Sequence, residues 1–99
     1  MSEITTMVST LKAKADELRE LNEVFKGERA ELMSTQEALN GMWEGEAKAA
    51  FDQAFKRDMI QFQNFYNAIN GYVEALEDIA NNYSMMEARN IELARERCY

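Results

Sequence analysis

The chain has 99 residues, with 18 acidic and 11 basic side chains and a formal net charge of −7. This length accommodates one small domain, and the acidic balance argues against nucleic acid as a partner, because such binding depends on neutralising phosphates with Lys and Arg. The chain lacks proline, the commonest helix breaker. It also lacks histidine and any Gly-rich phosphate loop. We therefore expect an all-α protein that is not an enzyme, with no catalytic residue, no cofactor and no metal site.

A first helix over about residues 3–39 is predicted by apolar residues that recur every seven positions. A sustained period of seven is typical of a helix that packs against other helices with a left-handed twist. The second position of this seam is polar at Asn22, Arg29 and Gln36, which favours the face of a bundle over a two-stranded zipper. The apolar members of the repeat are Ile4, Leu11, Leu18, Phe25, Leu32 and Leu39.

A turn is predicted over residues 40–45. Gly41 suits the left-handed position that ends a helix. In the Trp43-Glu44-Gly45 sequence that follows, the indole can cap the end of a bundle, and Gly45 lets the backbone turn closely beside it. A connection of about five residues makes the two helices antiparallel neighbours.

A second helix is predicted over about residues 46–84, again with a period of seven. Its apolar band is wider than one partner helix can cover, so we expect a homodimer that closes an elongated four-helix bundle. A heterodimer with a paralogue is the alternative. At about 1.5 Å per residue, helix one ends level with Tyr83, which leaves residues 85–99 as an overhanging tail of this single hairpin domain. The heptad members are Phe55, Phe62, Ile69, Leu76 and Tyr83.

Three features bear on where the protein acts. Cys98 is the only cysteine, so it has no intramolecular partner, and a surface thiol is favoured over an intermolecular disulfide. The first residues lack the basic start and apolar run of a signal peptide. No segment approaches the roughly 20 apolar residues of a membrane span. Taken alone, these features favour a cytoplasmic protein.

Two short motifs change that interpretation. Trp43-x-Gly45 stands between two long periodic helices, and Tyr83-x-x-x-Glu87 follows near the end of the second. With this length and hairpin pattern, nearly the whole chain resembles the WXG-motif, early-secreted-antigen-like family of small type VII secretion substrates. The family usually has an apolar residue where this chain has Asn90.

The resemblance implies both a location and a partner. Members of this family dimerise into four-helix bundles and are secreted without a cleaved signal peptide. Trp43 and Gly45 together with Tyr83 and Glu87 would form a composite export signal. A membrane-anchored secretion ATPase of the FtsK/SpoIIIE type would read it. After export, the protein would act as an effector or as an escort for other substrates.

Simpler interpretations stand beside these. Trp43 also suits a cap of the bundle, and Tyr83 continues the heptad of Phe55, so both can be packing residues. The rival function is a cytoplasmic helical adaptor whose tail docks an unrelated partner. A membrane-active effector is a third, which the net charge and the lack of a long apolar stretch disfavour.

Overall fold

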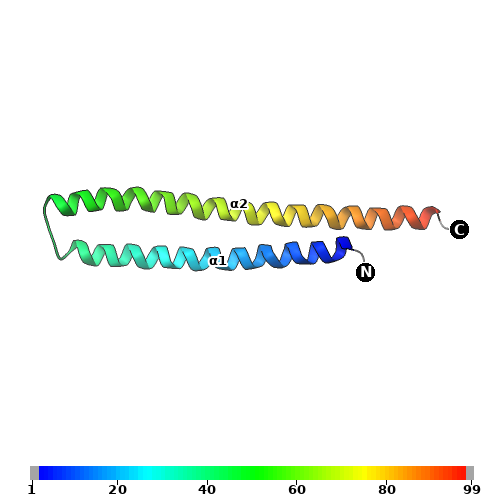
Figure 1. The fold of residues 1–99 in the computed structure, drawn as a ribbon, viewed down its shortest axis with the longest axis horizontal. Coiled ribbons are helices and arrows are strands. Elements are labelled where there is room, and N and C mark those ends of the chain that lie inside the picture. Colours follow the sequence, from blue (N-terminus) through cyan, green and yellow to red (C-terminus); the bar gives the residue numbers. More distant parts are fainter. Residues whose placement is uncertain (1–2, 98–99) are drawn as a thin grey trace. The chain divides into compact units, whose positions relative to one another are not determined.

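The computed structural model describes residues 3–97 as two helices, α1 (Glu3–Asn40) and α2 (Glu46–Arg97), joined by a short turn (Figure 1). That span contains no strand, which confirms the predicted all-α helical hairpin. Both helices run without interruption because the chain has no proline and is rich in Ala, Glu, Leu, Met, Lys and Arg, which favour helix. Cys98 lies outside the described residues.

The chain divides into two compact units, each containing a segment of α1 and a segment of α2. The first, called the terminal unit below, joins Met1–Arg19 with Gly71–Tyr99. The second, called the turn unit, is Glu20–Asn70 and includes the connection between the helices. Each unit is an antiparallel helix pair, so each has its own seam where α1 meets α2.

Small apolar side chains fill the seam of the terminal unit. Val8 and Ala15 of α1 are buried with Val73 and Ala80 of α2, and both alanines are 0% exposed. Alanine at these positions lets two helix backbones approach closely, but each buried methyl group contributes little apolar area. The terminal unit is therefore tightly packed around a small core.

Arg19 forms an ion pair at the edge of the terminal unit. Its guanidinium donates hydrogen bonds to the carboxylates of Glu77 and Asp16, both at 2.7 Å. The hydrogen bond to Glu77 is the main reason that the pKa of Arg19 is raised above its ordinary value, and the bond to Asp16 adds to it. The side chains of Arg19, Asp16 and Glu77 are 44%, 67% and 41% exposed, so solvent screens the interaction and we assign it little weight in stability.

Replacing Ala80 by leucine is expected to destabilise the protein by about 1–3 kcal/mol, because the larger side chain has no space in the closed seam. Urea unfolding followed by circular dichroism, at one fixed protein concentration, measures the change. Ala75→Leu is the matched control, since Ala75 lies on the same helix and is exposed. Equal unfolding midpoints for the Ala80→Leu and Ala75→Leu variants would contradict the close approach of the helices.

The face of α1 that is most deeply buried differs from the one that the sequence suggests first. Val8, Ala15 and Asn22, which belong to the second seam position, are 8%, 0% and 3% exposed. In contrast, Leu32 and Leu39 of the apolar repeat are 44% and 40% exposed. The apolar repeat of α1 therefore borders the seam, and within the turn unit much of it remains open to solvent.

The predicted end of helix two near residue 84 is wrong, because α2 continues to Arg97. The predicted overhang also begins too early. The single hydroxyl proton of Thr5 is shared between the two carboxylate oxygens of Glu87, which lie 2.9 and 2.8 Å from the hydroxyl oxygen. Glu87 is therefore level with the start of α1, and Tyr83 lies inside the paired region. Beyond Glu87, the remaining residues of α2, 88–97, are all exposed.

Candidate recognition site

The backbone of the turn is closed by three hydrogen bonds. The Gly41 N–H donates to the carbonyl of Glu37 at 3.3 Å, and the Met42 N–H donates to the carbonyl of Leu39 at 3.0 Å. The Ala49 N–H donates to the carbonyl of Gly45 at 3.1 Å, so Gly45 stands at the N-cap of α2. These hydrogen bonds stabilise the end of α1 and the start of α2, and they fix the turn of residues 41–45 between the two helices.

Gly45, and not Gly41, has the left-handed backbone. Among the described residues only Gly45 has a positive φ, +105°, which L side chains rarely adopt. A Cβ on Gly45 would meet no atom within 4 Å. The motif therefore requires glycine for its backbone conformation, and the space beside it is open. The prediction that Gly41 takes the left-handed position is wrong.

The Trp43 indole packs on the first turns of α2. Its ring lies edge-on to Phe51, with centroids 5.8 Å apart and an interplanar angle of 63°. Phe51 in turn stacks on Phe55 at 6.0 Å and 29°. Trp43 is half-buried, whereas the neighbouring Met42 is 81% exposed. The indole therefore caps one end of an aromatic row and still presents part of its surface to solvent.

A polar pocket of about 520 Å³ lies beside the indole. The buried indole nitrogen of Trp43 and the buried side-chain oxygen of Asn40 each lack a hydrogen-bond partner. A buried polar atom without a partner carries a desolvation penalty, so the turn is not optimised for stability alone. Asn40 and Lys48, which the sequence gave no reason to select, line this pocket. Its full lining is Asn40, Gly41, Met42, Trp43, Glu44 and Lys48.

Tyr83 and Glu87 lie in the terminal unit, one helical turn apart on α2, and therefore share a face. Both are half-buried. Glu87 accepts the shared hydrogen bond from the Thr5 hydroxyl, a pairing across 82 residues that no local pattern in the sequence signals. This contact holds the carboxylate of Glu87 beside the start of α1.

The structure thus groups the four predicted signal residues in pairs. Trp43 and Gly45 belong to the turn unit, and Tyr83 and Glu87 belong to the terminal unit. Each pair is locally ordered by its own contacts. Trp43 packs on Phe51, as its simpler interpretation anticipates, and Gly45 supplies the positive φ, whereas Tyr83 is half-buried.

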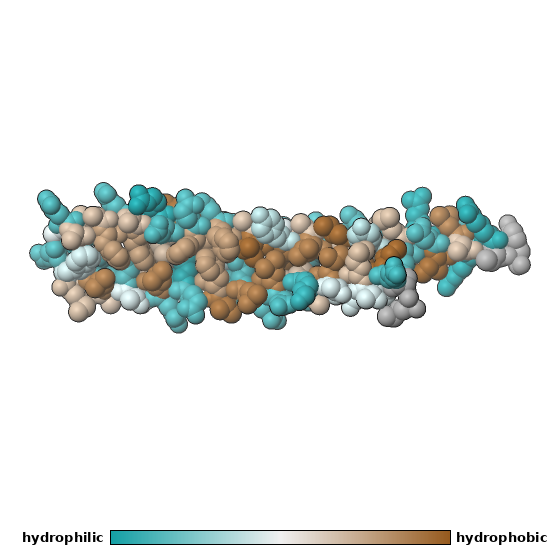
Figure 2. Space-filling model, viewed as in Figure 1, coloured by the Kyte–Doolittle hydropathy of each residue, from teal (hydrophilic) through white to brown (hydrophobic). Residues whose placement is uncertain are grey.

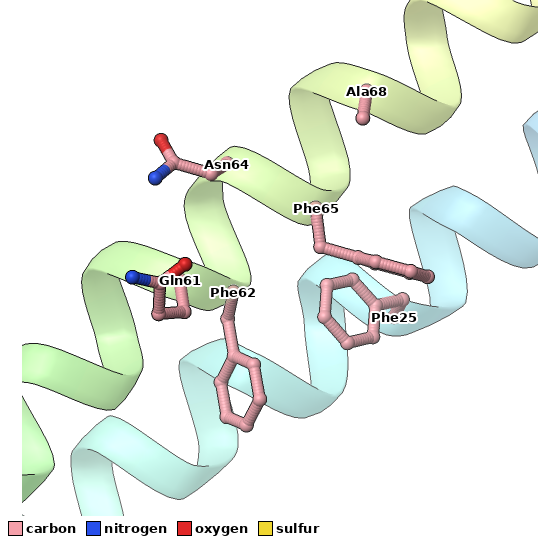
Figure 3. A pocket seen from close by; sticks show the side chains of 6 residues that line it. All are labelled: Phe25, Gln61, Phe62, Asn64, Phe65 and Ala68. Atoms are coloured by element: carbon pink, nitrogen blue, oxygen red, sulfur yellow. The ribbon is translucent and has the colours of Figure 1, made fainter.

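An apolar hollow lies on the turn unit, where three phenylalanines meet (Figure 3). Phe25 of α1 lies edge-on to Phe62 and Phe65 of α2, with centroid distances of 5.8 and 5.2 Å. Phe65 nevertheless remains 53% exposed. On the face drawn in Figure 2, apolar residues gather along the middle of the view and are bordered by hydrophilic ones. Such an aromatic cluster on a surface is typical of a protein–protein contact.

Neither helix is long and apolar enough to cross a membrane over the described span. The same span has no cluster of three or more Cys, Asp or Glu side chains arranged to hold a metal ion.

Comparison with known proteins identifies the family. A family model described as "WXG100: Proteins of 100 residues with WXG" matches residues 3–88, a span that includes both motifs. No curated protein and no solved structure matches the chain. WXG100 proteins are small helical substrates of type VII secretion that typically form dimers and are not known as enzymes. Because the match covers most of its length, this chain belongs to the WXG100 family of type VII secretion substrates.

Proposed function

We propose that the protein is exported by type VII secretion as a folded homodimer, and that Trp43, Gly45, Tyr83 and Glu87 form its export signal. The signal is read by a secretion ATPase of the FtsK/SpoIIIE type. The observation that carries this proposal is the family match over residues 3–88, which contains both motifs. After export, the protein acts as an effector or as an escort for other substrates.

The geometry of the two motifs supports a signal that is read on a folded chain. Trp43 is fixed by Phe51 and by the left-handed Gly45, and Glu87 is fixed by Thr5. The contact between Thr5 and Glu87 exists only when the helices are paired, and the positions of Trp43 and Gly45 require the folded turn and the start of α2. A receptor that recognises these side chains in these positions therefore distinguishes the folded substrate from an unfolded chain of the same sequence.

The accessible surface supports the homodimer. The chain exposes 7776 Å², whereas a compact monomer of this mass exposes roughly 5,800 Å². The excess of about 2,000 Å² is larger than the roughly 800 Å² that each partner buries in a standard interface. No large side chain among the described residues is fully buried. A second copy would supply the core that the single hairpin lacks.

Exposed apolar side chains occur in both units. In the turn unit they include Leu32, Leu39 and Phe65, and in the terminal unit Tyr72, Ile79, Met86 and Leu93. A homodimer places two such surfaces face to face, as expected for a symmetric interface. In an antiparallel homodimer, the α2 end of one protomer approaches the Trp43 turn of its partner and brings the two halves of the signal together.

Deleting the secretion ATPase is expected to remove the protein from the culture medium while it persists in the cells. Quantitative immunoblots of medium and cell fractions, normalised to a cytoplasmic marker, measure this. Complementation with the ATPase should restore export, and an ATPase with an inactive nucleotide site should not. Equal amounts in the medium with and without the ATPase would refute the pathway and favour a cytoplasmic adaptor that reaches the medium by lysis.

A further inference from the structure

Three polar side chains of α1 form a ladder across the seam of the turn unit. Asn22, Arg29 and Gln36 follow one another at intervals of seven and all donate hydrogen bonds to α2. Asn22 Nδ2 donates to the carbonyl of Tyr66 at 3.0 Å and to Asn70 Oδ1 at 2.9 Å. Arg29 Nη2 donates to the carbonyl of Met59 at 3.3 Å, and Gln36 Nε2 donates to Asp52 Oδ1 at 2.8 Å.

The acceptors of the ladder follow the same period. Asp52, Met59 and Tyr66 are also seven residues apart, so one straight row of donors on α1 meets one straight row of acceptors on α2. Asn22 is 3% exposed, which places at least this step in the interior. In the terminal unit the buried seam positions are instead apolar, Val8, Ala15, Val73 and Ala80, and a polar contact, that of Thr5 with Glu87, lies near the start of α1.

A ladder of this kind is not the most stabilising filling for a helix seam. A net hydrogen bond contributes less than the burial of a leucine side chain. Leucines are available three residues along the same helix from Arg29 and Gln36, at Leu32 and Leu39, and they remain 44% and 40% exposed. The polar row therefore occupies the seam, while the apolar row of α1, made of Phe25, Leu32 and Leu39, borders the solvent.

Covering the hairpin with a second chain explains this arrangement. If α1 were rotated so that its apolar row entered the seam, the donors of Asn22, Arg29 and Gln36 would face the second chain. These donors would then lose their contact with water without gaining a hydrogen-bond acceptor, and this desolvation costs free energy. With the ladder in the seam, Asn22 Nδ2, Arg29 Nη2 and Gln36 Nε2 each have an acceptor inside their own chain before the partner arrives, although Arg29 Nε and Asn22 Oδ1 are buried without a partner.

We infer that the Asn22–Arg29–Gln36 ladder determines the specificity of dimerisation, because it fixes which face of α1 is available to a second copy of this chain. The inference rests on the proposed homodimer. Buried polar residues at seam positions are known to select one packing arrangement and one oligomeric state at a cost in stability. Here the selected arrangement keeps Leu32 and Leu39 exposed beside the half-buried Phe25, as the contact surface.

The test replaces the whole ladder by leucine (Asn22→Leu, Arg29→Leu, Gln36→Leu) and compares it with Glu20→Leu, Glu31→Leu, Ser34→Leu. The control residues are exposed positions of α1 in the same unit. Native mass spectrometry and light scattering should find one dimeric species for the unchanged chain and the control. The ladder variant should form several species, because both rows of α1 can then serve as the seam. A single dimer for the ladder variant would overturn the inference.

A second measurement keeps the ladder and the homodimer separable. A reporter thiol is placed at Leu32→Cys in a Cys98→Ser background, and its labelling rate is measured at concentrations where the chain is monomeric. In the ladder variant, α1 can adopt two rotational orientations of similar energy about its own axis, and one of them buries the thiol at position 32. The thiol is then buried about half of the time, so the ladder variant should label about twofold more slowly than the chain with an intact ladder. Equal rates would overturn the inference. If the unchanged chain stays monomeric at every concentration, the homodimer is refuted. The labelling rates then test, on their own, whether the ladder fixes the orientation of α1.

Discussion

Replacing Trp43 by alanine is expected to lower the amount of protein in the medium at least about tenfold, while a helical protein accumulates in the cells. A tenfold loss corresponds to about 1.4 kcal/mol of recognition energy, which is modest for an aromatic hot spot at an interface. The indole has one ring contact, to Phe51, and lies outside the buried cores of both units. Its removal should therefore affect recognition more than folding.

The turn provides its own control for this experiment. Met42→Ala changes the neighbouring residue, which is 81% exposed and belongs to no motif. This variant should be exported normally. Circular dichroism and light scattering on both purified variants report whether helix content and assembly are preserved. Normal export of the Trp43→Ala variant would remove Trp43 from the signal, whatever its packing role.

The second half of the signal is tested in the same way. Tyr83→Ala should also block export, with Met85→Ala as its exposed neighbour on the same helix. Because Tyr83 is half-buried, a loss of export is informative only if the variant remains helical and assembled. If both Trp43→Ala and Tyr83→Ala chains reach the medium at normal levels, the composite signal is wrong, even though family membership stands.

Local patterns predicted the helices well because they depend on short-range information. The start of α1 at Glu3 and the start of α2 at Glu46 agree with the predicted residues, and α1 ends at Asn40, one residue beyond the predicted end. Heptad spacing, the missing proline and the glycines of the turn are enough to place these boundaries. The Trp43 motif was found for the same reason, since its residues are contiguous.

Pairings between distant residues set the limits of that prediction. The end of the paired region depends on the shared hydrogen bond between Thr5 and Glu87, which no helix period reveals. The choice of seam on α1 depends on acceptors of α2, such as Asn70 for Asn22. Hydrophobic periodicity ranks the row of Leu32 and Leu39 above a row that contains Arg29. It cannot register that each polar member of the second row has a partner across the seam.

This distinction matters for how the protein assembles. A chain that buried its most apolar row internally would gain monomer stability and lose its contact surface. The hairpin instead keeps aromatic and aliphatic side chains outside, around Phe25 and Phe65, and uses small or hydrogen-bonded residues inside. These features support the proposed homodimer.

The last prediction tests that conclusion directly. Phe65→Glu is expected to weaken the homodimer at least about thirtyfold, since loss of a central aromatic residue commonly costs about 2 kcal/mol or more. The new carboxylate would also be desolvated in the interface without a partner. Sedimentation equilibrium over a range of concentrations measures the dissociation constant.

Ile60→Glu is the matched control for Phe65→Glu. Ile60 lies on the same helix and is 62% exposed, compared with 53% for Phe65. However, residues five positions apart point about 140° away from each other on a helix, so Ile60 faces away from the aromatic hollow. The control should remain dimeric. If both variants dissociate equally, general acidity and not the aromatic face governs assembly. If the Phe65→Glu chain is monomeric and still exported normally, the secretion ATPase reads single hairpins, and the second copy serves a step after export.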